Sequence, residues 1–573
     1  MKPRIVFFTI SFLFFVASCN KKNNNSADLV LINGNIATLD EKIPKVEALA
    51  VKADTIQSLG TTKSIKQLIG DRTKVIDLKG KFVMPGFFES HAHFLSLGES
   101  KMELDLSKAS NWDDIIAMVA EAAEKANPGE WIIGRGWHQE KWDPVPEDNI
   151  EGYPRHNVLS SATPYNPVLL QHASGHALFA NKYAMNLAKV DTSVKDPKGG
   201  RIVRDSLKNA IGVFEEEAMP VIYNEYQKYM DNRSDKEIKN RMKKAVALAV
   251  KECLKYGITS FEDAGSTFEE IDFFKELIDS GKLPLRLNVM ILEKNSKLKE
   301  KISDYKIINY GNNHLTVRAI KRYMDGALGS RGAWMLSDYS DLPEHRGFNV
   351  TPLKTIRETA RIAIENGFQL CTHAIGDKAN RETLNIYGKI FKQNPDKTDL
   401  RWRVEHAQHL ARQDIPRFAQ LGVIAAMQPI HATSDAPFVI KRLGHERAKR
   451  GAYVWRKLID SGAIICSGTD APVESVNTIE NYYAAVTRKL NNGKSFFPEE
   501  KMTREEALKS YTYNGAYAAF QEQHLGLLQI GMLADIAVLS QDITSVPEER
   551  IKNTTVEMTI IGGKIVYQKN RKK

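Results

Sequence analysis

Short runs rich in β-branched residues alternate with stretches of helical periodicity through the middle of this chain of 573 residues. Such alternation is typical of βα units that build a parallel sheet. Eight runs can be counted, and eight parallel strands fit a closed (β/α)8 TIM barrel, an α/β fold; a six-stranded open sheet is the alternative. The predicted strands are Phe82–Phe88, Ile258–Glu262, Leu285–Ile291, Val317–Met324, Gln369–His373, Arg401–Glu405, Gly422–Met427 and Ala463–Cys466.

The rest of the chain divides into an insertion and two ends. About 160 residues separate the first predicted strand from the second, too many for one helix and its loops. We therefore expect a large insertion after strand one, at about 100–255, that shapes the substrate mouth. Both chain ends, 28–82 and 525–573, are rich in short β-type runs, and neither alone makes an adequate core. We predict that they form one composite β-sandwich beside a barrel domain at 83–524.

The first residues indicate the compartment. Lys2 and Arg4 precede the uncharged run Ile5–Ser18, which is too short to span a membrane as a mature helix. Small residues directly before Cys19 resemble a bacterial lipoprotein signal, so we expect residues 1–18 to be removed and Cys19 to carry a lipid; an ordinary signal peptide is the alternative. The polar residues 19–27 would then tether the body to a membrane of the bacterial cell envelope, periplasmic or outer.

Composition excludes several classes of protein. A hydrophobic content of 42% allows a large buried core, which excludes a mainly disordered chain. The net charge of +10 comes from positive residues spread along the chain, so we expect no nucleic-acid partner. The four cysteines lack CxxC spacing, which excludes a thiolate zinc finger. No GxSxG elbow, P-loop or GxGxxG fingerprint occurs, so the chain lacks the motifs of serine hydrolysis, phosphoryl transfer and dinucleotide binding. A small-molecule substrate is the expected partner, and assembly into a homodimer stays open.

Polar residues with metal-binding chemistry stand on five predicted strands, near the barrel face that carries active sites. His91 and His93 are two residues apart in an extended segment, so both imidazoles can reach one metal ion. Each such residue alone is as readily a core or surface side chain. In chain order, the set is His91, His93, Lys321, His373, His406 and Asp470. This ordered set predicts a divalent metal site.

Motifs along nearly the whole chain resemble the amidohydrolase superfamily, and specifically the amidohydrolase 3 family, which includes N-substituted formamide deformylases. The matching segments are PGFFESHAH at 85–93, GRGW at 134–137, SGHALFAN at 174–181, GGRIVRD at 199–205, KRYMDGALGSR at 321–331, HAIGD at 373–377, EHAQ at 405–408, QPIHATSD at 428–435, GTDAP at 468–472 and GMLADIAVL at 531–539.

The resemblance implies roles for the six residues. It makes His91, His93, His373 and His406 metal ligands, and Lys321 a lysine that carbon dioxide carboxylates into a bridge between two metals. Asp470 matches an aspartate that binds metal and handles the proton. Imidazole and carboxylate ligands suit zinc first, with iron or manganese as alternatives, and one or two ions per chain.

These roles predict the hydrolysis of a carbon–nitrogen bond other than a peptide bond. A divalent cation lowers the pKa of bound water to about 7, and Asp470 takes the proton and passes it to the departing nitrogen. A cyclic imide hydrolase or a deaminase on the same barrel is the alternative and differs in the leaving group. A catalytically inactive, lipid-anchored binding protein is a further alternative, and it would lack ligands that this chain has.

Four residues are candidates for substrate contact. Trp137, beside His138, is predicted to line the mouth, with aromatic core filling as the alternative. His176 and His431 are expected to face the pocket. Arg331 follows a glycine-rich turn and could hold a substrate carboxylate through its planar fork; pinning a loop is the alternative.

Overall fold

The computed structural model describes residues 25–569. The predicted signal segment at 1–18 and the lipidation site Cys19 lie outside the described residues. Among the helices within 25–569, none is long and apolar enough to cross a membrane.

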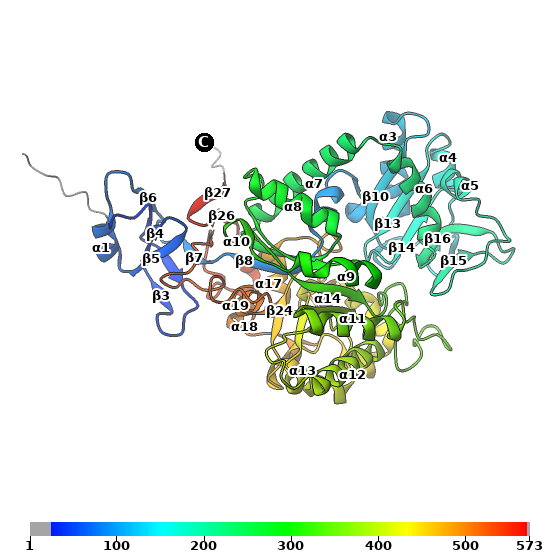
Figure 1. The fold of residues 1–573 in the computed structure, drawn as a ribbon. Helices are drawn as coiled ribbons and strands as arrows, with labels where there is room; N and C mark the ends of the chain where they lie inside the picture. The colour runs from blue at the N-terminus through cyan, green and yellow to red at the C-terminus, as the bar shows by residue number, and fades with distance from the viewer. Residues whose placement is uncertain (1–24, 570–573) are drawn as a thin grey trace, which may run out of the picture.

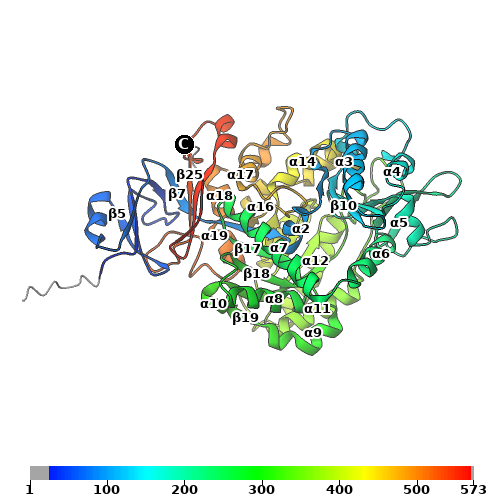
Figure 2. The same ribbon diagram turned by 90° about the horizontal axis from the view of Figure 1, so that it is seen from above.

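Eight parallel strands form the central barrel, which lies in the middle of Figures 1 and 2. They are β8 Phe87–Ala92, β17 Ile258–Ser266, β18 Arg286–Ile291, β20 Leu315–Tyr323, β21 Gln369–Ala374, β22 Arg403–His406, β23 Ile424–Met427 and β24 Ile465–Ser467. Seven neighbouring pairs run from β8 through β17 to β24, and the short β19, Ile307–Asn309, pairs antiparallel with β20. The predicted eight-stranded parallel barrel is confirmed, and the open six-stranded sheet is wrong.

Hydrogen bonds beyond the strand ends bring the first and last strands together. The N–H of Asp470 donates to the carbonyl oxygen of His91 over 2.7 Å, and the N–H of His93 donates to that of Ala471 over 2.8 Å. The barrel is therefore nearly closed at the end where the predicted ligands lie.

The predicted first strand is divided in two. Phe82–Pro85 is β7 and belongs to a sheet of the chain ends, while the barrel strand β8 begins at Phe87. Gly86 separates them, and a Cβ atom there would lie 2.2 Å from the side chain of Thr259. The chain passes from one sheet to the other because glycine allows this close approach.

Helices surround the barrel (Figure 1). They are α8 Phe268–Asp279, α9 Asn295–Lys301, α10 Tyr310–Asn313, α11 Leu353–Asn366, α12 Asp377–Gln393, α13 Ile415–Leu421, α14 Pro429–Leu443, α15 His445–Gly451, α16 Trp455–Asp460, α17 Thr478–Thr487, α18 Arg504–Ser510 and α19 Tyr513–Ala518. The longer ones, such as α11 and α12, are amphipathic and bury an apolar face against the barrel. Gly367 and Gly422 end α11 and α13 in the left-handed conformation, with φ of 65° and 64°.

A long excursion between β8 and β17 builds a second sheet with its own core, on the right of Figure 1. Its strands, in sheet order, are β15 Gly200–Arg204, β16 Ala210–Glu216, β14 Ala177–Ala180, β13 Val168–His172, β10 Ile132–Trp137 and β9 Leu104–Asp105. The hairpin β11 Asn149–Ile150 and β12 Tyr153–Pro154 and the helices α3 Trp112–Lys125, α4 Asn157–Ala162, α5 Lys182–Leu187 and α6 Pro220–Asp231 complete it. The first and last helices of the excursion, α2 Phe94–Ser100 and α7 Asp235–Lys255, pack in the core of the barrel instead.

Two further sheets lie on the left of Figure 1, one built from N-terminal strands alone and the other from strands of both chain ends. The first, in sheet order, is β5 Thr55–Gly60, β4 Ala48–Lys52, β1 Leu29–Ile32 and β6 Lys74–Asp77, with α1 Thr62–Ile65 beside it. The second is β27 Lys564–Gln568, β26 Val556–Ile561, β25 Ile536–Leu539, β7, β2 Asn35–Ala37 and β3 Lys45–Val46. Leu31 and Val51 of the first share one apolar cluster with Ile536 and Ile560 of the second, so each chain end completes the core of the other.

Candidate metal centre and its cavity

His91 is held in place by a carboxylate. It lies near the end of β8 with its ring fully buried, and its Nδ1 is hydrogen-bonded to Glu405 at the end of β22. Metal-binding histidines commonly donate their second ring N–H to a carboxylate in this way, which leaves the other nitrogen free as a ligand. The Nε2 atom of His91 lies 3.3 Å from the Nζ atom of Lys321, near the carboxyl end of β20.

Asp470 brings a carboxylate to the two histidines of strand one. Its Oδ1 atom lies 3.2 Å from Nε2 of His93 and 3.6 Å from Nε2 of His91. These three residues each offer a ligand atom within 4.8 Å of the others. The loop after β24 that carries Asp470 is thus fixed against the end of β8 by side chains as well as by backbone hydrogen bonds.

Two more imidazoles lie beside this group. His406, at the end of β22, has its ring centroid 4.7 Å from that of His91, and its Nδ1 contacts Oε1 of Gln428 over 2.8 Å. The ring of His373 lies 4.5 Å from that of His406, and within the described chain its buried Nε2 has no hydrogen-bond partner. Both rings can therefore offer a nitrogen to an ion between them.

The pKa values of these groups favour the protonation states that bind a metal ion. Burial, together with the nearby Lys321 ammonium, lowers the pKa of His91 to about 4, and burial also holds the pKa of His373 and His406 well below the usual value. Burial opposes ionisation of Asp470, but its contact with His93 and the other imidazoles keep its pKa well below the ordinary range. Neutral imidazoles and an ionised carboxylate form a donor set that fits a divalent transition metal. The structure brings all six predicted ligands together.

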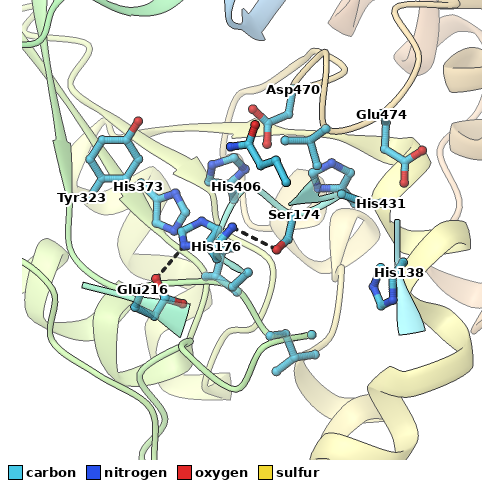
Figure 3. A pocket seen from close by; sticks show the side chains of 18 of the residues that line it. His138, Ser174, His176, Glu216, Tyr323, His373, His406, His431, Asp470 and Glu474 are labelled. Carbon is cyan, nitrogen blue, oxygen red and sulfur yellow. Dashed lines mark hydrogen bonds and ion pairs between the residues drawn. The ribbon is translucent and has the colours of Figure 1, made fainter. Parts of the chain in front are cut away.

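A cavity of about 440 Å³ opens over this centre (Figure 3). The barrel supplies His373, His406, Asp470 and Tyr323 to its wall. The insertion supplies much of the rest of the wall, including Arg135, His176 and Glu216. A substrate in this cavity would touch barrel and insertion together.

His176 projects into the cavity from the loop before β14. Its Nδ1 lies 2.9 Å from Oε2 of Glu216, at the end of β16, and its ring lies 5.5 Å from that of His373. Burial opposes protonation of this imidazole, but the Glu216 carboxylate outweighs it and raises the pKa of His176. Figure 3 shows the pair beneath His373.

His431, in the first turn of α14, also lines the cavity. The amide nitrogen of Gln408 lies 2.9 Å from its Nδ1. In this orientation the amide donates, so the ring proton of His431 resides on Nε2. That buried Nε2 has no hydrogen-bond partner among the described residues.

Trp137 and Arg331 do not line the cavity. Trp137 is fully buried in the core of the insertion, where its indole N–H donates to the carbonyl oxygen of Leu170 over 2.8 Å. The guanidinium of Arg331 is paired with Asp341 at 3.1 Å and with Glu151 at 3.6 Å. Trp137 therefore fills the core, and Arg331 pins a loop, as the two alternatives proposed. The prediction that these residues contact the substrate is wrong.

Sequence reasoning missed residues that position or extend the site. Glu405 and Gln428 orient two imidazoles, Glu216 orients a third, and Arg135 and Tyr323 line the cavity. Glu405 and Arg135 lie inside the quoted EHAQ and GRGW segments, which was the available signal. Their partners are distant in sequence, so spacing could not reveal them.

Comparison with known proteins yields a consistent set of relatives. A model described as the amidohydrolase family matches residues 74–567. The protein LONG AFTER FAR-RED 3 of Arabidopsis thaliana is 32% identical over 569 residues, covering 94% of this chain and 92% of the relative. The N-substituted formamide deformylase of Arthrobacter pascens is 24% identical, covering 95% and 98%. A crystal structure of an uncharacterized metal-dependent hydrolase from Pyrococcus horikoshii OT3 matches with a TM-score of 0.72 and 25% identity, covering 91% of this chain and 99% of that one.

Proposed function

This chain belongs to the amidohydrolase family and is a hydrolase of carbon–nitrogen bonds, and we propose that it cleaves an amide-type bond of a small molecule at a divalent metal centre. The observation that carries the proposal is the convergence of His91 Nε2, His93 Nε2 and Asp470 Oδ1 at the ligand end of the barrel. Buried imidazoles of β21 and β22 lie directly beside them.

The residues fit one or two zinc ions, and iron or manganese would accept the same ligands. A cation bound there supplies Lewis acidity, which polarises a carbonyl group and lowers the pKa of water. The residues proposed to hold it are His91, His93, Lys321, His373, His406 and Asp470.

Asp470 is the proposed catalytic residue. Its carboxylate is ionised at neutral pH, its Oδ1 atom lies 3.2 Å from Nε2 of His93 and 3.6 Å from Nε2 of His91, and the residue lines the cavity. We propose that it accepts a proton from the attacking water and returns it to the departing nitrogen. The fixed loop around it keeps this oxygen at the reacting bond.

Lys321 is proposed to react with carbon dioxide. Its side chain is fully buried, and burial lowers the pKa of its ammonium, which favours the neutral amine that the reaction needs. The carbamate would carry two oxygens toward His91, whereas an ammonium has no lone pair to offer a metal. Mass spectrometry under native conditions, or activity that rises with bicarbonate, tests this step.

His176 and His431 are proposed to hold the substrate. The Nε2–H of His431 is a free donor for a substrate oxygen, and Glu216 keeps the His176 ring turned to the centre. Such donors stabilise the charge that develops on a carbonyl oxygen during hydrolysis.

A substrate screen tests the function. Zinc-reconstituted protein should contain one to two metal equivalents per chain, by the ligand count, and should hydrolyse at least one of a set of N-substituted formamides, N-acyl amino acids and cyclic amides. The name of the Arthrobacter pascens relative makes formamides the first to try. Ammonia as the leaving group would favour a deaminase, and ring opening a cyclic imide hydrolase. Metal-free protein after zinc addition would overturn the proposal.

We also propose, from the sequence, that Cys19 is lipidated and anchors the enzyme to a membrane of the bacterial cell envelope.

A further inference from the structure

We infer that Arg135 binds a carboxylate of the substrate, so that the enzyme acts on N-acyl amino acids or related amide-type acids. Arg135 lies in β10 of the insertion and lines the cavity over the metal centre. The inference rests on the proposed function, because it takes this cavity to be where the amide-type substrate binds.

Three neutral oxygens hold the guanidinium in place. Its Nη1 donates to Oε1 of Gln171 over 2.6 Å, its Nη2 to the carbonyl oxygen of Ala173 over 3.4 Å, and its Nε to that of Pro472 over 3.4 Å. Pro472 lies two residues beyond Asp470, so the guanidinium is tied to the loop that carries the catalytic carboxylate. Arginine has five N–H donors, and these contacts leave one on each terminal nitrogen.

Among the described residues, no carboxylate is directly paired with this charge, although Glu103 and Asp470 favour it from a longer distance. Within residues 25–569, no carboxylate oxygen lies within 4.0 Å of an Arg135 nitrogen. Several buried arginines in and around the barrel are paired with carboxylates: Arg331 with Asp341, Arg403 with Glu262 and Glu405, and Arg442 with Glu140 and Asp341. Arg135 is only partly exposed, and Glu103 and Asp470 act on its guanidinium from beyond 4.0 Å, so an anionic ligand would supply the direct counter-charge that the described residues do not.

The lysines of the cavity wall are already engaged. Lys141 lies 3.2 Å from Oγ of Ser434 and 3.7 Å from Glu474, and Glu216 is hydrogen-bonded to His176. Lys321 belongs to the metal centre. Arg135 is therefore the cation of the described wall that is left for an anion from outside.

The donor geometry selects the class of anion. The two free N–H groups are on adjacent terminal nitrogens of a planar fork, which matches the two oxygens of a carboxylate. A substrate with an amide at the metal centre and a carboxylate on Arg135 would be bound at two points, which orients the scissile bond. An N-acyl amino acid is the simplest molecule with both groups.

Matched pairs of ligands test this. Each N-formyl or N-acetyl amino acid is compared with its carboxamide, which has the same shape and no charge, in zinc-loaded wild type, Arg135→Gln and Arg135→Lys. For these substrates the measurement is kcat/KM. Calorimetry also gives the Kd of N-methanesulfonyl amino acids and their carboxamides, which an amide hydrolase does not cleave. Lys141→Gln is the control, because it removes another cation from the same wall.

We expect wild type to prefer the carboxylate of each pair. In Arg135→Gln, the affinity and kcat/KM for the carboxylate should fall by about 10- to 100-fold. The same two quantities for the carboxamide should change by less than about threefold, so the preference for the carboxylate disappears. Arg135→Lys should fall between, and Lys141→Gln should keep the preference. Equal losses for both members of a pair, or a wild type that prefers the carboxamide or binds neither ligand, would overturn the inference. Turnover of amides without carboxylate preference would overturn the inference and leave the proposed function intact. Selective carboxylate binding without any amide turnover would refute the proposed function and, with it, the substrate class, and would leave only the binding of a carboxylate by Arg135.

Discussion

The backbone N–H of Asp470 donates a 2.7 Å hydrogen bond to the carbonyl oxygen of His91. This bond joins the loop after the last barrel strand to the first strand, so two predicted ligands that are far apart in sequence become neighbours. Asp470 adopts a φ of 57°, and His406 one of 73°, in the left-handed region that is unfavourable for residues other than glycine. Strained backbone at two predicted ligand positions is typical of functional sites, where the surrounding fold holds the strain.

Replacing Asp470 with asparagine should abolish most turnover and spare the fold. The amide keeps the size of the side chain but cannot accept the proton, so we expect kcat/KM to fall by about 10²- to 10⁴-fold on any substrate that the screen identifies. Steady-state kinetics, with metal content and circular dichroism as controls, checks this. Hydrolysis at the wild-type rate would remove Asp470 from the mechanism.

The Glu405→Gln substitution should weaken metal binding. Loss of the carboxylate that orients His91 is expected to lower metal affinity by about 10- to 100-fold, measured by competition with a chromogenic chelator. Glu262→Gln is the matched control, since Glu262 contacts Arg403, as Glu405 does, without contacting His91. Equal losses in both variants would indicate general damage to the barrel interior instead.

Trp137→Phe should affect stability rather than substrate binding. The substitution removes the hydrogen bond to Leu170 and leaves space in the core of the insertion, so we expect the free energy of unfolding to fall by about 1–3 kcal/mol. KM should stay within about twofold of wild type. A rise in KM of about tenfold at unchanged stability is what the loss of a direct substrate contact would cause. That result would show that Trp137 contacts the substrate.

His409 should make the fold sensitive to acid. Both of its ring nitrogens are buried without a partner in the described chain, and burial lowers its pKa to about 3, against about 6.5 when unfolded. As the pH falls below about 6.5, His409 binds a proton in the unfolded state but stays neutral in the folded state. The free energy of unfolding therefore decreases from about pH 6.5 toward about pH 3. In His409→Leu, the drop in unfolding free energy between pH 7 and pH 5 should shrink by about 2 kcal/mol. The exposed His445, changed to leucine, is the control, and an unaltered pH dependence in His409→Leu would count against the prediction.

Cys19 should carry the lipid. In a bacterial host supplied with labelled palmitate, the full chain should take up label and sediment with membranes, and Cys19→Ser should do neither. Release of unlabelled wild-type protein would favour the ordinary signal peptide.

Much of the barrel could be predicted from the sequence. Strand residues reveal themselves through β-branched runs, and ligand candidates through their types and order at strand ends. The division of Phe82–Phe88 into β7 and β8 was not predictable in this way, because its apolar run is continuous across Gly86 and only pairing with different sheets separates the halves.

By itself, then, the sequence determined the α/β class, the eight barrel strands, the amidohydrolase family and the six candidate ligands, because periodicity and motif spacing are local properties. Only the tertiary structure decided what each side chain contacts. Glu405 reaches His91 across 314 positions, Arg331 is paired with Asp341, and Arg135 is left with neutral partners in the cavity wall. The residue type gives a side chain its charge, but whether an opposite charge pairs with it depends on residues that only folding brings close.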